Sequence, residues 1–205
     1  PRPPPNESSA ASDVYKRQSD IYAANAVPVW AMAAVTLGSA RVDLQQSQLA
    51  QLMAGGLVAL SEAGAQLVGG HTGESEALGI GYAVTGWREG PPNIPSAGDD
   101  PVLVLTKPLG TGVVMAGHMK LAARGAWVTA AADMMARGNG LAAATLAPHR
   151  PVMTDVTGFG LARHAMNLAE RCGMQGIEID LAALPLLDGA KTCLLYTSDA
   201  ADDSL

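Results

Sequence analysis

Apolar positions in the first part of the chain follow helical and strand-like patterns in turn. Residues 19–26 predict a short helical turn, and an apolar run over 29–37, bounded by proline and glycine, predicts a buried strand. The next segment carries leucine and methionine at helical spacing, which predicts a helix that ends near Gly64. Asp43 and Gln46 have the spacing of a capping box at the start of this helix.

The remaining pattern alternates short apolar runs with longer helical stretches. The short runs predict further strands over 65–68, 78–87, 102–106, 151–154 and 177–179. Alanine-rich stretches predict helices over 113–124 and 128–137, and a last amphipathic helix stops at Gly173. Strands that alternate with helices in this way indicate an α/β or α+β fold.

The two ends of the chain differ in character from the rest. Residues 1–18 are rich in proline and serine and lack an apolar period, and the last stretch, 193–205, reads CLLYTSDAADDSL. The segments SDVYKRQ and CLLYTSDAADD resemble translated sequencing-adapter sequence. We therefore expect 1–18 and 193–205 to be non-native or disordered and to lie outside the fold, with natural disordered tails as the alternative.

A proline- and glycine-rich stretch divides what remains. Residues 89–100 contain three prolines and two glycines, a composition typical of a linker between domains. We place the linker at 91–100. The sequence thus predicts a first domain over 19–90 and the first part of a second domain over 101–192.

Composition narrows the class of protein. Hydrophobic residues make up 48% of the chain, which is ample for a core, but aromatic residues make up only 4%, so that core must be largely aliphatic. The net charge of −6 argues against a nucleic-acid binder, which needs a basic face. No apolar run reaches the roughly 18 residues that a membrane span requires, and no secretory signal is visible. We expect a cytoplasmic protein without a membrane partner.

Two aspartates are candidates for binding a metal ion. Asp20 lies beside an alanine-rich turn, and Asp155 follows a predicted strand and precedes a glycine-containing turn. Carboxylate oxygens are the ligands that Mg²⁺ uses in proteins, together with the phosphate oxygens of a nucleotide. Each aspartate has an ordinary alternative interpretation, as the N-cap of a helix or as part of a turn.

A glycine pair marks a candidate nucleotide site. Gly69, Gly70, His71 and Thr72 follow the apolar run over 65–68, where glycines allow a ligand to approach the backbone and N–H groups can hold an anion. Thr72 adds a hydroxyl donor. An ordinary turn is the alternative interpretation, and His71 lacks the Cys or His neighbours that a zinc site needs.

The order of these motifs resembles one enzyme family. The succession of SDIYA, VGGHTGES, TKPLGTG and MTDVTGFG is similar to selenophosphate synthetase (selenide, water dikinase) over nearly all of 19–191. TKPLGTG together with MTDVTGFG is the pair most typical of that family. The resemblance places the chain in the superfamily of aminoimidazole ribonucleotide synthetase, and it implies a two-domain fold that this chain contains only in part.

The resemblance also implies a reaction and a site. It implies ATP-dependent phosphorylation of selenide in the presence of water, giving selenophosphate, AMP and orthophosphate. Asp20 and Asp155 match Mg²⁺-binding carboxylates, and Asp20 also matches a nucleotide contact. Gly69, Gly70, His71 and Thr72 match an ATP-binding segment that acts across a homodimer, in which the N-terminal sheets form a barrel. The implied partners are ATP and selenide.

The chain also departs from the family pattern. The reactive Cys or selenocysteine and the essential Lys of the family precede the matching span, so we expect no catalytic side chain within it and no synthetase activity from this fragment alone. We also expect weak ATP binding, because two carboxylates do not make a full Mg²⁺ cluster. Two alternatives stay open: another ATP-dependent small-metabolite kinase or synthetase of the same superfamily, and a non-catalytic, dimer-forming fragment.

Overall fold

The computed structural model describes residues 5–38, 40–90 and 101–197, and the chain divides into two compact units. Unit 1 comprises Pro1–Ile94 and Ala136–Asp155, and unit 2 comprises Pro95–Met135 and Val156–Leu205. Residues 136–155 therefore belong with the first unit, whereas the sequence predicts them in a second domain over 101–192. The predicted linker, 91–100, lies outside the described residues. None of the described helices is both long and apolar enough to cross a lipid bilayer.

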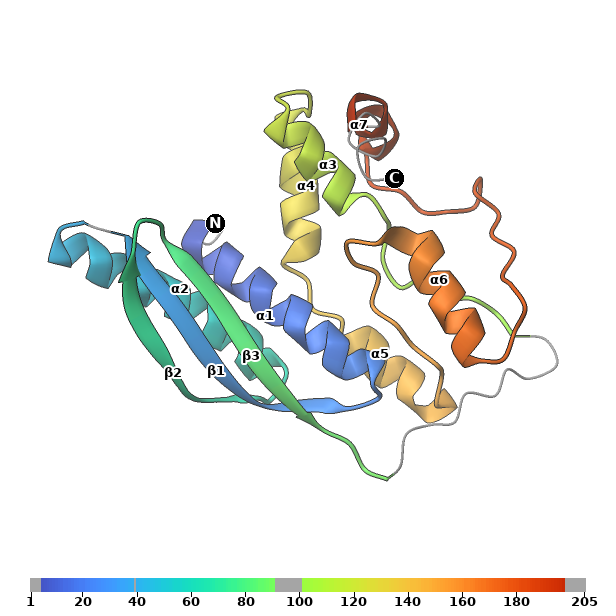
Figure 1. The fold of residues 1–205 in the computed structure, drawn as a ribbon, viewed down its shortest axis with the longest axis horizontal. Coiled ribbons are helices and arrows are strands. Elements are labelled where there is room, and N and C mark those ends of the chain that lie inside the picture. Colours follow the sequence, from blue (N-terminus) through green and yellow to red (C-terminus); the bar gives the residue numbers. More distant parts are fainter. Residues whose placement is uncertain (1–4, 39, 91–100, 198–205) are drawn as a thin grey trace. The chain divides into compact units, whose positions relative to one another are not determined.

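Unit 1 is a layer of helices on a three-stranded sheet (Figure 1). Its elements are α1 (Pro5–Ala23), β1 (Val27–Gly38), α2 (Val42–Glu62), β2 (Gln66–Ser75), β3 (Gly79–Trp87), α5 (Gly140–Leu146) and the short 3₁₀ helix η1 (Ala147–His149). The strand order is β2-β1-β3, with β1 parallel to β2 and antiparallel to β3. Helix α2 makes the crossover that a parallel pair requires, and α1 and α2 cover the same face of the sheet.

The central strand has one buried and one open face. Ala31, Ala33 and Val35 are buried against the helices, whereas Trp30 and Met32, which alternate with them along the strand, are 52% and 54% exposed. This alternation corrects the prediction of a fully buried strand over 29–37, because only one side of the sheet is covered in this chain. The open face of the sheet is therefore apolar at its centre.

Helix α1 corrects the expectation that residues 1–18 lie outside the fold. Ala10 and Val14 are completely buried in the core of unit 1, and the Gln18 side chain donates to the Ala59 carbonyl of α2 at 3.1 Å. Tyr15 donates a hydrogen bond to Glu62 at 2.5 Å. Burial, together with this bond and the charge of Glu62, raises the pKa of Tyr15, which keeps the hydroxyl protonated as a donor.

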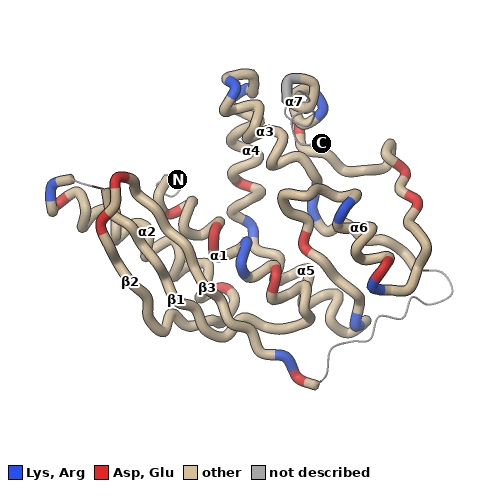
Figure 2. The backbone as a smooth tube through the Cα atoms, viewed as in Figure 1, with Lys and Arg blue, Asp and Glu red and all other residues tan. Residues whose placement is uncertain are grey.

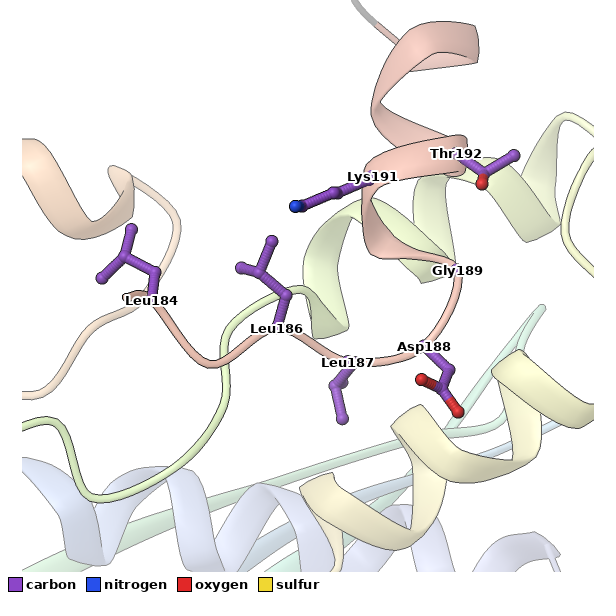
Figure 3. Close-up of a pocket in the computed structure, with 7 residues that line it drawn as sticks. All are labelled: Leu184, Leu186, Leu187, Asp188, Gly189, Lys191 and Thr192. Carbon is purple, nitrogen blue, oxygen red and sulfur yellow. The ribbon is translucent and has the colours of Figure 1, made fainter. Parts of the chain in front are cut away.

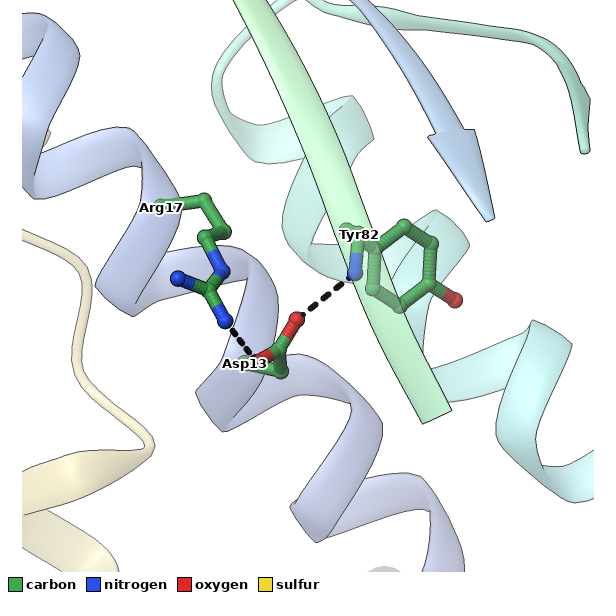
Figure 4. Close-up of polar contacts among 3 residues, drawn as sticks. All are labelled: Asp13, Arg17 and Tyr82. Carbon is green, nitrogen blue, oxygen red and sulfur yellow. Dashed lines mark hydrogen bonds and ion pairs between the residues drawn. The ribbon is translucent and has the colours of Figure 1, made fainter. Parts of the chain in front are cut away.

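An aspartate of α1 also occupies the outer edge of β3. Asp13 accepts a hydrogen bond from the Tyr82 backbone N–H at 2.8 Å and pairs with Arg17 at 3.3 Å (Figure 4). Because that N–H points away from β1, the carboxylate satisfies a backbone donor that the sheet leaves free. Residues 5–18 therefore hold the sheet as well as the core, whereas 1–4 lie outside the described residues.

Helix α2 begins without its predicted cap. Arg41 is the N-cap residue and supplies no side-chain cap bond, and it forms an ion pair with Asp43 at 2.9 Å instead. The predicted stop is confirmed, because the chain leaves α2 through Gly64 at a φ of 69°.

Unit 2 is built from helices α3 (Thr111–Met119), α4 (Gly125–Met135), α6 (Gly160–Arg171) and α7 (Ala190–Thr197). Its core contains Val114, Ala131, Ala190 and Cys193, all buried. Cys193 therefore lies inside the fold, although the sequence predicts a tail from that residue onward. Residues 198–205 of the predicted tail are outside the described residues.

Three predicted strands do not form. The described segments 102–106, 151–154 and 177–179 carry no strand assignment, and Val102 and Val104 are 88% and 63% exposed. An apolar run becomes a strand only when a neighbouring strand satisfies its backbone groups. Among the described residues of unit 2, the only bridge of this kind joins Leu109 to Leu186.

Candidate functional site

Asp20 lies in the last turn of α1, not at a helix N-terminus as its alternative interpretation required. Helix α1 ends at Ala23, and Asn25 follows in the left-handed region at a φ of 53°. A carboxylate near the C-terminal end of a helix meets the negative end of the helix dipole, which is unfavourable. Helix stability therefore does not explain an aspartate at this position.

Asp155 lies at the end of an extended segment that follows η1. It does not cap α6, because Phe159 is the N-cap residue of that helix and makes no side-chain cap bond. The alternative interpretation of Asp155 as an N-cap is therefore excluded as well. Asp155 is partly buried and is the last residue of unit 1.

The structure brings these two aspartates within electrostatic reach of each other. Partial desolvation raises the pKa of Asp20, and the negative charge of Asp155 raises it further, whereas Arg17 and Lys16 lower it. Within the described residues, no group of three or more His, Cys, Asp or Glu side chains has metal-binding geometry. What this chain offers is a carboxylate pair, which fits the one or two protein carboxylates by which Mg²⁺ is usually held beside a phosphate.

Two amide side chains attach the segment that carries Asp155 to α1. Asn139 donates to the Ser19 hydroxyl at 2.7 Å, and Ser19 in turn donates to the Tyr15 carbonyl at 2.8 Å. Asn25 donates to the Pro151 carbonyl at 3.0 Å. Sequence reasoning missed Ser19, Asn25 and Asn139, because each contact joins residues more than 100 positions apart or lies inside a segment predicted to be foreign. An asparagine just after a helix end was the one available signal.

The glycine pair lies within a strand and not in a turn after it. Gly69, Gly70, His71 and Thr72 are in the middle of β2, so the strand predicted over 65–68 continues through them, and the alternative interpretation as an ordinary turn is excluded. The register of β2 shifts at Val68, since Ala31 pairs with Leu67 and Met32 with Gly69. Such a bulge is frequent next to binding sites.

Gly70 has a steric reason to be glycine. A Cβ at this position would collide with the carbonyl of Ala33 on β1. His71 pairs with Ala34, whose side chain belongs to the open face of the sheet, so His71 shares that face. Helix α1 covers the opposite face. Within one chain, the sheet therefore separates the His71 side chain from the helix that carries Asp20.

A separate hollow lies in unit 2. It has a volume of about 310 Å³ and is lined by residues of the segment 184–192, including Asp188, Gly189 and Lys191 (Figure 3). This segment is tied to the predicted TKPLGTG loop, because Leu109 donates to Pro185 and Leu187 donates to Leu109, each at 2.9 Å. The side chains of Lys191 and Asp188 point in different directions, and none of the predicted site residues lines the hollow.

Lys, Arg, Asp and Glu occur along the backbone of both units (Figure 2). Known proteins share both the sequence and the fold. Residues 5–87 match the family described as AIR synthase related protein, N-terminal domain. Selenide, water dikinase from Geobacter metallireducens is 41% identical over 177 residues, which cover 84% of this chain and 50% of that protein. Its counterpart from Desulfitobacterium hafniense is 39% identical over 183 residues, covering 85% and 51%. Residues 5–87 of the chain belong to the AIR synthase-related family.

The relatives in this superfamily are longer than the chain. It spans about half the length of the curated relatives it matches. The family match begins at residue 5, so it includes most of the segment 1–18 that the sequence predicts to lie outside the fold.

Solved structures of other proteins share this fold. Thiamine monophosphate kinase from Aquifex aeolicus has a TM-score of 0.69 at 21% identity, covering 93% of this chain and 65% of that one. The hydrogenase maturation protein HypE from E. coli has a TM-score of 0.69 at 18% identity, covering 92% and 59%. A structure described as AaThiL complexed with AMPPCP and TMP has a TM-score of 0.64 at 21% identity, covering 93% and 62%. These likenesses confirm the α/β fold class.

Proposed function

We propose that this chain is part of a selenophosphate synthetase and supplies the Mg²⁺-binding carboxylates Asp20 and Asp155 to its ATP site. The observation that carries the proposal is that two aspartates 135 positions apart in the sequence (155 − 20) belong to one folded unit, in which the charge of Asp155 reaches Asp20 and raises its pKa. The relatives named selenide, water dikinase support the choice of selenide as the phosphoryl acceptor. The structure complexed with AMPPCP supports ATP as the donor.

The carboxylate pair would hold a Mg²⁺ ion that neutralises the negative charge of the phosphates. When bound, Mg²⁺ neutralises phosphate oxygens and so favours their reaction with a nucleophile. Asp20 and Asp155 would hold the ion from two separate segments and so orient the phosphate chain between them. Partial desolvation raises the pKa of Asp20. It also strengthens the attraction of the carboxylate to a cation, because fewer water molecules screen the charges.

The backbone of Gly69 to Thr72 would hold the nucleotide. Gly69 offers open space at the position of a side chain, and all four residues are exposed on β2. Backbone N–H groups and the Thr72 hydroxyl are suitable donors to phosphate oxygens. Because the sheet separates the His71 side chain from α1 of its own chain, His71 would serve the carboxylate pair of a second copy.

A homodimer would also account for the open face of the sheet. Trp30, Met32, Val68 and Trp87 are apolar and more than half exposed, which is unfavourable for a face left in water. A second copy that covers this face would remove the apolar surface and bring its β2 to the site. Replacing Trp30 by Asp should therefore lower the dimer fraction in sedimentation velocity at least tenfold, because a charge would be buried without a partner.

The matched control for that measurement is Leu44→Asp. Leu44 is exposed to a similar extent, at 50%, but lies on α2, away from the open face. It should leave the dimer fraction unchanged. Equal sedimentation of the parent and Trp30→Asp chains as monomers would reject the homodimer.

The metal site is tested by titrating the chain with Mn²⁺, a spectroscopically visible substitute for Mg²⁺, with and without ATP. Asp20→Asn and Asp155→Asn should each weaken Mn²⁺ binding about tenfold or more, because each removes one of two ligands. Asp43→Asn makes the same charge change on an exposed residue that pairs only with Arg41 among the interactions described, and it should have no effect. Unaltered affinity in both site variants would reject the proposed site.

Activity separates the chain from the parent enzyme. We propose that the 205-residue chain alone forms no selenophosphate from selenide and ATP, and that its affinity for ATP with Mg²⁺ is weaker than micromolar. Selenophosphate production by the purified chain, followed by ³¹P NMR, would overturn this expectation.

The second candidate is a small-metabolite kinase, favoured by the fold shared with thiamine monophosphate kinase. Turnover of thiamine monophosphate in place of selenide would select it.

A further inference from the structure

Asn25 makes two kinds of contact, one through its backbone and one through its side chain. Asn25 lies in the left-handed region at a φ of 53° and ends α1. Its N–H donates to the Tyr22 carbonyl at 2.8 Å, and the next N–H, of Ala26, donates to Ile21 at 3.1 Å. This is the hydrogen-bond pattern of a Schellman cap, in which glycine is the usual residue because it adopts a positive φ without strain. The backbone alone therefore does not call for a side chain here.

The side chain of Asn25 has a partner in a distant segment. Its amide donates to the Pro151 carbonyl at 3.0 Å, and the contact is partly buried. Pro151 begins the extended segment that runs to Asp155, and this segment is not part of any sheet in the described chain. A backbone carbonyl outside a ladder needs a donor from elsewhere, and the Asn25 amide supplies one.

The chain that leads into this segment is also held to α1, at the start of α5. Asn139 bonds to Ser19, and a Cβ on Gly140 would approach the Tyr22 hydroxyl to 2.9 Å, so the backbone here lies directly against the helix. The contacts run along α1 in the order Ser19, Tyr22, Asn25. The Asn25 contact is the last of them before Asp155, which follows Pro151 by only four residues.

We propose, on the basis of the proposed function, that Asn25 is a positioning residue that fixes the Pro151–Asp155 segment against the end of α1 and so holds the Asp155 carboxylate beside Asp20. Asn25 does not touch the metal ion or the phosphates. It acts through the backbone of Pro151, and its side chain determines where the second carboxylate lies. The ligand class is a divalent cation bound by two carboxylates, for which a displacement of about 1 Å in one ligand is costly.

Two variants test the contact, and both can adopt the left-handed backbone conformation of position 25. Asn25→Gly suits a positive φ and removes the amide, and Asn25→Asp is nearly isosteric but cannot donate to a carbonyl. The control is Asn6→Asp, because the Asn6 amide also makes a partly buried bond, to Gln51 at 3.0 Å, elsewhere on α1. We expect Asn25→Gly to weaken Mn²⁺ binding about five- to tenfold, the size expected for one lost hydrogen bond. Asn6→Asp should leave the affinity unchanged.

A double-mutant cycle separates positioning from a general loss of structure. In the Asp155→Asn chain, Asn25→Gly should produce no further loss of Mn²⁺ affinity, because the residue it positions is already disabled. An equal loss in both backgrounds, or no loss in either, would overturn the proposal.

Hydrogen exchange gives a readout that does not depend on the metal. Asn25→Gly should accelerate amide exchange in 152–156 at least fivefold while exchange in β1 stays unchanged. Unchanged exchange in 152–156 would overturn the positioning role. If Asp20→Asn and Asp155→Asn leave the Mn²⁺ affinity unchanged while Asn25→Gly still accelerates amide exchange in 152–156, the proposed metal site is rejected. The role of Asn25 in fixing the Pro151–Asp155 segment against α1 is then retained.

Discussion

Both units contain apolar segments, but these segments form a paired sheet only in unit 1. In unit 1, β1 has a strand on each side, and its buried face meets α1 and α2. In unit 2, helices α3, α4 and α7 share a small core, while the apolar run 102–106 remains outside any sheet. A helix forms its backbone hydrogen bonds within itself, whereas a strand depends on a neighbouring strand to form them.

The largest expected effect on stability comes from a substitution in the core of unit 1 at a residue of α1, within the segment 1–18 that the sequence predicts to be non-native or disordered. Val14 is completely buried, so Val14→Asp places a charge in that core and should cost about 4 kcal/mol or more of unfolding free energy. Urea unfolding monitored by hydrogen exchange should show loss of protection in β1 and β3.

The matched variant in unit 2 is Val114→Asp, which also alters a fully buried valine. It should remove protection from α3 and α4 and spare the sheet of unit 1. If Val14→Asp left β1 as protected as in the parent chain, α1 would not be part of the working core.

The next effect sharpens the contrast between stability and function within unit 1. Asp20 has a pKa raised above its ordinary value of 3.8, so the folded state holds the proton more tightly than the unfolded state. Its contribution to stability is present below pH 3.8 and is lost as pH rises through the raised folded pKa. Asp20→Asn should therefore raise the melting temperature at about pH 7 without divalent ions and leave it little changed at about pH 3. Mg²⁺ should stabilise the parent chain more than the variant.

Thermal melts at the two pH values, with and without Mg²⁺, measure this directly. A lower melting temperature for Asp20→Asn at neutral pH in the absence of Mg²⁺ would mean that the carboxylate stabilises the fold. Asp20 would then have a structural role, and a ligand would not be needed to explain it.

The smallest effect compares two buried tyrosines. Tyr15→Phe removes the hydrogen bond to Glu62 and should cost about 1 kcal/mol of unfolding free energy. The Tyr82 hydroxyl is buried against Gly56 of α2 and makes no hydrogen bond within the described residues, so Tyr82→Phe should be neutral or slightly stabilising. Urea denaturation of both variants checks the difference. Equal destabilisation would mean that the Tyr82 hydroxyl has a partner such as water.

Much of the helical structure is predictable from local pattern. Periodicity predicts helices α2, α3, α4 and α6, and the stops at Gly64 and Gly173 are confirmed by their positive φ. Most of helix α1 is not predicted. Ala10, Val14 and Gln18 have helical spacing, but the proline- and serine-rich composition and the adapter-like segment favour a non-native end. The predicted strands over 102–106 and 177–179 are wrong because sequence cannot show whether a partner strand is present.

The candidate site is predictable only through resemblance. Nothing in the local sequence pattern around Asp20 or Asp155 pairs them, and the sequence alone also allowed Asp20 as a helix cap and Asp155 as a helix cap or part of a turn. Family likeness selects both, and their electrostatic coupling is consistent with that choice. Asn25 cannot be found in this way, since its role depends on a contact with Pro151 that only the folded chain reveals.

The most direct test is a crystal structure of the chain grown with Mn²⁺, with anomalous diffraction locating the ion. We expect one anomalous peak within about 2.5 Å of carboxylate oxygens from both Asp20 and Asp155. A peak elsewhere, or the two carboxylates turned to separate surfaces with the ion bound to neither, would contradict it.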